Sequence, residues 1–122
     1  MDIKKHITAL GFVPKDGTNG IYHKIYVDYA IEIDFEKQSI NYGGGITADS
    51  KTTQNFSDAE NFVVLECVDR LLTKGYKPQN LILEKTWPSG HGTSGRLDIC
   101  VNREDGTPYM LIECKTYGKE YN

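Results

Sequence analysis

The amino-acid sequence predicts an α+β domain with a mainly antiparallel or mixed β-sheet and flanking helices. Apolar and polar residues alternate in several short stretches, as they do in half-buried strands. In two longer stretches the apolar residues recur at helical spacing instead. The chain has 122 residues, of which 39% are apolar and 25% charged. That balance is typical of a single globular domain with its own core.

The first third of the chain predicts a helix followed by an antiparallel meander. Residues 2–10 form the expected helix, and Gly11 is a typical stop signal directly after it. Its apolar face carries Ile3, Ile7 and Leu10. The strands of the meander are expected at residues 21–27, 29–35 and 40–42. A sharp alternation marks the first two, whereas the third is short and ends at a run of three glycines.

A polar, turn-rich stretch and a second helix follow. Residues 46–56 are interpreted as a surface linker. Ser57 and Glu60 are spaced as a capping box, in which each side chain satisfies the free backbone amide of the other. The helix is expected to begin there and to end near Gly75. Its apolar stripe comprises Val64, Leu65, Val68, Leu71 and Leu72.

The second half of the chain predicts the order α-β-β-β. Its strands are expected at residues 81–86, 96–101 and 109–115. We therefore expect one compact domain with two parts. Residues 1–56 form an N-terminal helix and meander extension, and residues 57–122 form the core that carries the chemistry.

Charge and cysteine content narrow the classes of function. The net charge of −3 argues against a dedicated high-affinity nucleic-acid binder. The acidity is concentrated in residues 1–60, with 6 basic and 9 acidic residues, whereas residues 61–122 have 8 of each. Cys67, Cys100 and Cys114 form no CxxC pair and are expected to be small buried residues. Without a signal or membrane segment, a cytoplasmic location is expected.

The last two predicted strands carry the candidate chemistry. Asp105-Gly106 is a strong turn dipeptide, so these strands are expected to pair as a hairpin. In the register that this turn sets, Asp98 faces Glu113, with Cβ atoms about 4.5–5.5 Å apart. Lys115 lies two positions beyond Glu113 and projects from the same face of the strand.

This grouping fits the hydrolysis of a phosphodiester. Two carboxylates that close repel each other unless a cation lies between them. Mg²⁺ takes one or two protein carboxylates and completes its shell with water and phosphate oxygens. A lysine beside the ion can orient the attacking water. The alternative is a solvated sheet face on which Lys115 pairs with acidic neighbours, but burying charges in apolar strands is costly without such a purpose.

Residues 62–117 resemble a known family. The signals are a helix that ends in Lys-Gly-Tyr, a strand with Leu-Glu, then Gly-Arg-Leu-Asp-Ile, and finally Ile-Glu-Cys-Lys. In this order they are similar to the N-terminal nuclease domain of type I restriction enzyme R subunits. They also resemble related restriction–methyltransferase fusions, all within the PD-(D/E)xK superfamily. The match covers under half of the chain and implies a restriction-endonuclease-like core.

The resemblance also implies roles for individual residues. Asp98 and Glu113 would be ligands of Mg²⁺ or Mn²⁺, and Lys115 would be the catalytic lysine. The main-chain carbonyl of Cys114 would supply a further metal ligand.

The family commonly adds a glutamate from the preceding helix, and here two residues compete for that role. Glu60 lies at the expected distance from the end of the helix but also fits the capping box. Glu66 lies on the side of the helix away from the apolar stripe, which is typical of a solvated glutamate. The sequence leaves the choice open.

The family resemblance also predicts the larger setting. Such nucleases usually continue into a helix with a Gln and a Tyr, whereas this chain stops at Asn122, so a fragment of a longer polypeptide is expected. The predicted function is metal-dependent DNA cleavage within a restriction–modification enzyme, with DNA and other domains or subunits as partners. The alternative is a non-catalytic nuclease fold for DNA positioning or subunit docking. An interaction domain with an accidental motif is a third interpretation.

Overall fold

The α+β class expected from the sequence is confirmed by the computed structural model. It describes residues 2–88 and 94–114, and for residues 87–88 and 94–97 it describes the backbone alone. In chain order the described elements are α1 (Ile3–Ala9), β1 (Val13–Pro14), β2 (Ile21–Tyr26), β3 (Tyr29–Asp34), β4 (Ser39–Asn41), β5 (Thr47–Ala48), α2 (Glu60–Thr73), the 3-10 helix η1 (Pro78–Asn80), β6 (Leu81–Pro88), β7 (Ser94–Asn102) and β8 (Pro108–Ile112). These strands form two four-stranded sheets, ordered β1-β2-β3-β4 and β5-β6-β7-β8.

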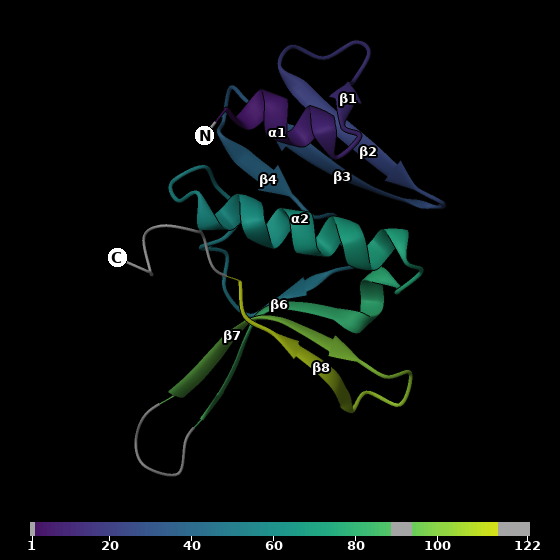
Figure 1. Cartoon of the computed structure of the whole chain (residues 1–122), viewed down its shortest axis with the longest axis vertical. Helices are drawn as coiled ribbons and strands as arrows, with labels where there is room; N and C mark the ends of the chain where they lie inside the picture. The colour runs from purple at the N-terminus through teal and green to yellow at the C-terminus, as the bar shows by residue number, and fades with distance from the viewer. Residues whose placement is uncertain (1, 89–93, 115–122) are drawn as a thin grey trace.

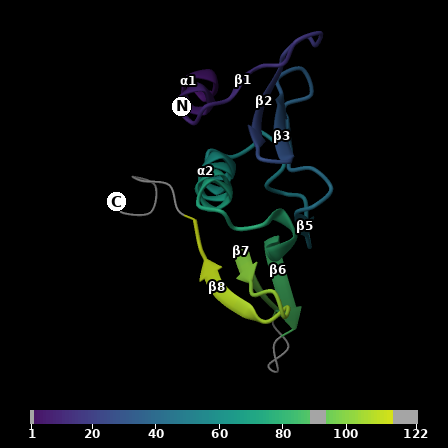
Figure 2. The same cartoon turned by 90° about the vertical axis from the view of Figure 1, so that its right-hand side faces the viewer.

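Helix α2 lies between the two sheets and shares one hydrophobic core with both (Figures 1 and 2). Eight of its 14 residues are buried, six of them apolar, a wider buried face than packing against a single layer requires. Ile31 and Ile33 enter the core from the first sheet, and Leu83 and Ile99 enter it from the second, all fully buried. Burial of each such side chain contributes about 1.5–3 kcal/mol.

The first helix and its stop signal lie where the sequence predicts them. The Asp2 side chain accepts a hydrogen bond from the Lys5 amide at 3.1 Å and so caps α1. Gly11 follows the helix with a φ of 103°, a conformation that costs glycine little and other residues more. The predicted strands at 21–27, 29–35 and 40–42 are observed as β2, β3 and β4, with slightly shorter bounds.

The alternating strand β2 turns its tyrosine and lysine side toward the core. Ile25 is 64% exposed on the outer face, whereas Tyr26 is buried. On the inner face the register pairs Lys24 with Ile31. This orientation is possible because the polar ends of these side chains find partners inside the molecule.

Asp69 of α2 supplies those partners. Its Oδ1 accepts hydrogen bonds from Lys24 Nζ and from the Tyr26 hydroxyl, each at 2.6 Å. Lys24 Nζ also donates to the Leu10 carbonyl at 2.6 Å. Burial, together with the contact with Asp69, raises the pKa of the Tyr26 hydroxyl. One carboxylate thus joins the first sheet and the end of α1 to the central helix.

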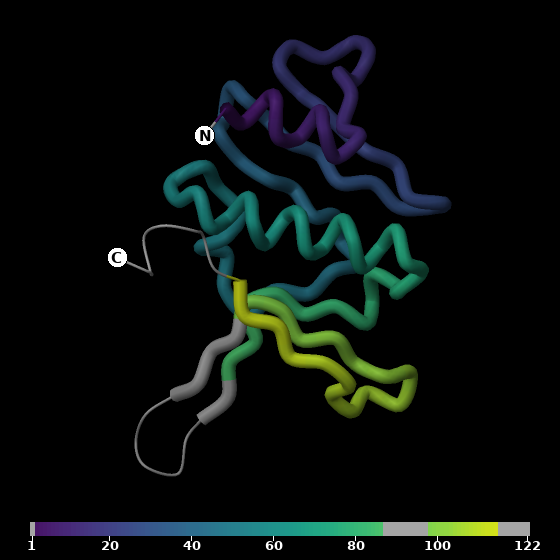
Figure 3. Tube along the Cα trace, in the orientation of Figure 1, coloured from purple at the N-terminus to yellow at the C-terminus, as the bar shows by residue number. Residues whose placement is uncertain are grey.

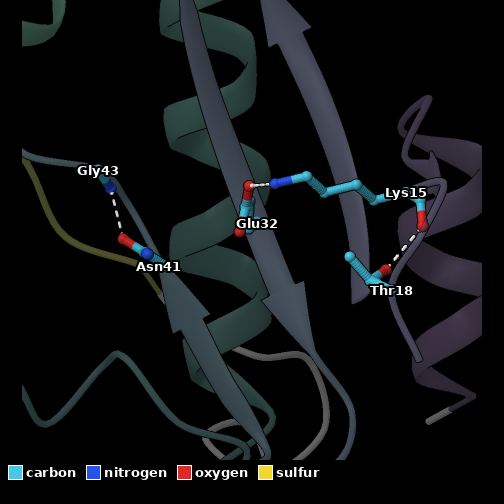
Figure 4. Close-up of polar contacts among 5 residues, drawn as sticks. All are labelled: Lys15, Thr18, Glu32, Asn41 and Gly43. Carbon is cyan, nitrogen blue, oxygen red and sulfur yellow. Dashed lines mark hydrogen bonds and ion pairs between the residues drawn. The ribbon is translucent and has the colours of Figure 1, made fainter. Parts of the chain in front are cut away.

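Polar contacts join the first sheet to the loops beside it (Figure 4). Lys15 Nζ reaches Glu32 Oε2 on β3 at 2.5 Å, and the Thr18 hydroxyl donates to the Lys15 carbonyl at 2.6 Å. At the end of β4, the Gly43 amide donates to the Asn41 side chain at 2.8 Å. These contacts fix the loops on either side of the meander.

The interpretation of residues 46–56 as a surface linker is wrong. Strand β5 within this stretch pairs in parallel with β6, matching Thr47 to Ile82. Ile46 and Thr53 are both buried. The polar composition misled because Thr52 and Thr53 bind the buried Glu84 of the second sheet. The second sheet therefore begins before residue 57.

The predicted capping box is also wrong. Helix α2 begins at Glu60, and the Asp58 carboxylate accepts the Glu60 amide at 2.9 Å. The Ser57 hydroxyl donates to the Asn55 side chain instead. Asp58 therefore satisfies an amide of the first turn, and the chain before it folds back over the second sheet.

The Lys24–Asp69 pair yields a test of how the first sheet is attached. Asp69→Ala is expected to lower the free energy of unfolding by about 3 kcal/mol, because it leaves a poorly solvated ammonium group without its charged partner. The side chains of Lys24 and Asp69 are only 23% and 9% exposed. Urea denaturation measures the loss.

Glu66→Ala on the same helix is the matched control. Its ion pair with Arg70 joins positions one turn apart, the Arg70 side chain is 71% exposed, and the contact of Glu66 with His6 of α1 is longer, at 3.6 Å. We expect this variant to lose less than about 0.5 kcal/mol. Equal losses in the two variants would contradict the role assigned to Asp69.

Candidate active site

The β7–β8 hairpin positions two of the predicted site residues. Its paired residues include Ile99 with Ile112, Cys100 with Leu111 and Val101 with Met110. This is the register predicted from the Asp105-Gly106 turn, and Gly106 has the positive φ of 87° that favours glycine. Continued by one residue, it places Asp98 opposite Glu113, which directly follows β8. Figure 3 traces the hairpin and the strand β6 beside it.

The Asp98 carboxylate holds the chain where it leaves β8. The amide of Cys114 donates to Asp98 Oδ2 at 2.7 Å. A charged acceptor makes this one of the stronger kinds of hydrogen bond. The main chain of Cys114, predicted to offer a carbonyl ligand, is therefore adjacent to the predicted ligand Asp98.

A cavity of about 270 Å³ opens beside Asp98. Its lining comes from β7, from the first turns of α2 and from the segment before that helix, namely Thr52, Thr53, Ser57, Asp58, Glu60, Asn61, Val64 and Asp98. Three of these residues are acidic, and none of the described lining residues is basic. Such a lining concentrates negative potential and favours a cation.

The structure separates the two glutamates between which the sequence could not choose. Glu60 lines the cavity together with Asp98. Glu66 lies on another side of α2, where it contacts Arg70 at 2.8 Å and His6 of α1 at 3.6 Å. Six residues along a helix correspond to a rotation of about 120° away from the starting face. Glu60 is therefore the candidate for the third carboxylate.

Glu84 supports this site, and the sequence analysis noted it only as part of a Leu-Glu pair without assigning it a role. It is 1% exposed, and its place between the paired residues of β6 and β7 sets it opposite Asp98. Its φ of 51° lies in the left-handed region, which is rare for a residue other than glycine within a strand. Such strain persists only where surrounding contacts enforce it. A lone glutamate inside the apolar strand LILEKTW was the available signal.

The contacts that hold Glu84 come from the segment before α2. The Thr52 hydroxyl donates to Glu84 Oε1, and the Thr53 amide and hydroxyl donate to Oε2 at 3.2 and 3.3 Å. Asn61 of α2 in turn donates to the Thr52 carbonyl at 3.3 Å. Glu84 therefore anchors one wall of the cavity to the second sheet.

Two thiols lie near this site, because the Cys114 amide is bonded to Asp98 and its thiol contacts Cys67. The Cys114 thiol donates to Cys67 Sγ on α2 at 3.6 Å. This hydrogen bond lowers the pKa of the Cys67 thiol to about 7. The same contact, together with burial, raises the pKa of the Cys114 thiol. Cys100 and Cys114 are buried, as expected, whereas Cys67 is only partly buried.

The donor set suits a hard cation that shares its shell with water and substrate. Over the part of the chain that the structure describes, no three His, Cys, Asp or Glu side chains gather closely enough to hold a metal by themselves. Mg²⁺ needs only one or two protein carboxylates, and the carboxylates of Asp98 and Glu60 line the same cavity. Lys115, predicted as the catalytic lysine, lies outside the described residues.

Comparison with known proteins leaves the family resemblance a hypothesis. No family model, no curated protein and no solved structure matches this chain. Neither of the described α-helices is long and apolar enough to cross a membrane.

The role of Glu84 can be tested by its removal. Glu84→Ala is expected to destabilise the protein by about 2 kcal/mol, because the threonine donors lose a charged acceptor in a buried place. Hydrogen exchange in residues 47–55 should rise with it, because their anchor on the sheet is lost. The exposed Glu36, which accepts from Asn19 at 3.0 Å, offers the matched control Glu36→Ala. That control is expected to stay within about 0.5 kcal/mol of the wild type. Unchanged exchange in Glu84→Ala would refute the anchoring role.

Proposed function

We propose that this chain is the nuclease-like module of a DNA restriction–modification enzyme, and that it hydrolyses DNA phosphodiesters with Mg²⁺ or Mn²⁺. The observation that carries the proposal is the acidic cavity shared by Asp98 and Glu60. Glu113 stands at the position facing Asp98 in the hairpin register. The order of the motifs between residues 62 and 117 adds the family resemblance.

A few residues would each have a separate role in the reaction. When bound, the metal ion would polarise the phosphate and acidify a coordinated water. Asp98 and Glu113 would hold the ion from two neighbouring strands, with the Cys114 carbonyl as a further oxygen donor. Because Asp98 Oδ2 accepts the Cys114 amide, the two sides of this ligand set are tied together. Lys115 would orient the attacking water through its ammonium group.

Glu60 would complete the acidic lining from α2. Its helix is fixed from both sheets, so the third carboxylate approaches the hairpin on a rigid support. The segment anchored by Glu84 closes the same cavity from the other side. Together these contacts preorganise the carboxylates before a cation arrives.

The proposed partners are DNA and the other domains or subunits of the same enzyme, in the cytoplasm. Residues 61–122 carry equal numbers of basic and acidic residues, so this part of the chain has no acidic surplus. Recognition of a DNA sequence would come from elsewhere in the full protein.

A non-catalytic docking or DNA-positioning module is the second candidate. It is favoured by one observation, because Asp98 Oδ2 is already engaged by the Cys114 amide. Under this alternative the carboxylates serve the fold and bind no metal.

Cleavage of DNA by the full-length protein with Mg²⁺ tests the proposal. Asp98→Ala and Lys115→Ala are each expected to reduce the rate about 100-fold or more, because they remove a metal ligand and the group that serves the water. The exposed Asp28 on the β2–β3 turn gives the matched control Asp28→Ala, expected to cleave at the wild-type rate.

DNA cleavage that survives both substitutions would contradict the catalytic assignment. Titration calorimetry distinguishes the nuclease from the docking module. The nuclease must bind Mg²⁺ or Mn²⁺, and Asp98→Ala must weaken that binding. A folded wild-type protein that takes up neither ion supports the docking module instead.

A further inference from the structure

The fold brings together two thiols from distant parts of the chain. Cys67 lies on α2 and Cys114 lies directly after β8, yet their Sγ atoms are 3.6 Å apart. Both are free thiols. The third cysteine, Cys100, is engaged elsewhere, since its thiol donates to the Asn102 side chain at 3.4 Å.

A short movement would convert this contact into a disulfide. The sulfur atoms of a disulfide lie about 2.05 Å apart, so they must approach by about 1.5 Å. Helix α2 is packed on both sides and resists displacement. Cys114 lies beyond the last residue of β8, where its amide is held by the Asp98 side chain and not by a strand ladder. The approach would therefore come mainly from Cys114.

Access to solvent differs between the two thiols. Cys67 is partly exposed, whereas Cys114 is 3% exposed. A small oxidant can thus reach Cys67 first, and Cys114 stands within reach as the resolving thiol. Thiol pairs of this kind in reducing compartments serve as transient redox sensors more often than as permanent cross-links.

We propose that Cys67 and Cys114 form a reversible oxidation site that takes a peroxide as its oxidant. The Cys67 sulfur attacks one peroxide oxygen, the O–O bond breaks, and a sulfenic acid and one water are formed. The Cys114 sulfur then attacks the sulfenic sulfur, and the S–O bond breaks as a second water leaves. Two thiols are oxidised to one disulfide while one hydrogen peroxide is reduced to two waters.

Oxidation would also rearrange the candidate active site, a consequence that rests on the proposed function. The Cys114 amide donates to Asp98, and Glu113 precedes it directly. Drawing Cys114 toward α2 pulls its amide away from Asp98 and shifts Glu113 with it. The disulfide form would therefore cleave DNA more slowly than the dithiol form.

Mass spectrometry of the folded protein tests the oxidation site. The folded wild type is treated with hydrogen peroxide, then denatured, alkylated with N-ethylmaleimide and weighed intact. We expect one alkylated thiol in place of three and a cross-linked peptide pair that contains Cys67 and Cys114. Cys100→Ser is the matched control and should form the same cross-link, whereas Cys67→Ser and Cys114→Ser should not. Dithiothreitol should restore all alkylation sites.

Three alkylated thiols after peroxide treatment, a cross-link to Cys100, or a cross-link between chains would overturn the proposal. Hydrogen exchange of the Cys114 amide, followed by NMR, tests the link to Asp98, and it should accelerate at least tenfold on oxidation. An unchanged amide would refute the rearrangement. Absence of cleavage in both redox states would refute the nuclease function and leave the mass result in place.

Discussion

The structure depends on one constraint. Helix α2 must pack against two sheets at once and must also provide hydrogen-bond partners on both sides. Its apolar residues fill the core between the sheets, and its polar residues are placed where each sheet offers a matching group. Toward the first sheet, Asp69 receives Lys24 and Tyr26. Toward the segment that closes the second sheet, Asn61 donates to the Thr52 and Asn55 carbonyls. The free-energy cost of burying a polar group without such a partner would exceed the free energy gained by burying its apolar neighbours.

The same constraint explains why the carboxylates around the cavity differ in their tasks. Glu84 is buried and serves the donors of Thr52 and Thr53, so it has a structural task. Asp98 ties the end of the hairpin through Cys114 and also lines the cavity, and Glu60 reaches the same cavity from α2. Because Asp98 and Glu60 line the same cavity, a cation bound there would reduce the repulsion between their carboxylates.

Patterns of period two and strong turn residues made much of the fold predictable. The alternation in β2 and β3 and the Asp105-Gly106 turn specified these strands and the register that sets Asp98 opposite Glu113. Strands β1 and β5 have two residues each, which is too short for a periodic pattern to be recognised in the sequence. Which face of β2 is buried also escaped the sequence, because it depends on Asp69, 45 residues away from Lys24.

The candidate site was predictable only where its residues are neighbours along a hairpin. Glu84 escaped because its task depends on the threonines of a segment that composition marks as a surface linker. Glu60 could not be preferred to Glu66 without the placement of α2 against the hairpin. Long-range pairings of this kind are set by the packed core and leave no local pattern in the sequence.

The central claim is that the cavity beside Asp98 is a cation site, and paramagnetic broadening by Mn²⁺ in NMR spectra tests it most directly. At substoichiometric Mn²⁺, the account predicts selective loss of the amide signals of Glu60, Asp98 and Cys114. Signals near Glu32 and Asp69, two acidic residues of the first sheet and its contact with α2, should persist. Broadening centred on those residues, or spread evenly over all exposed carboxylates with the cavity spared, would contradict the claim.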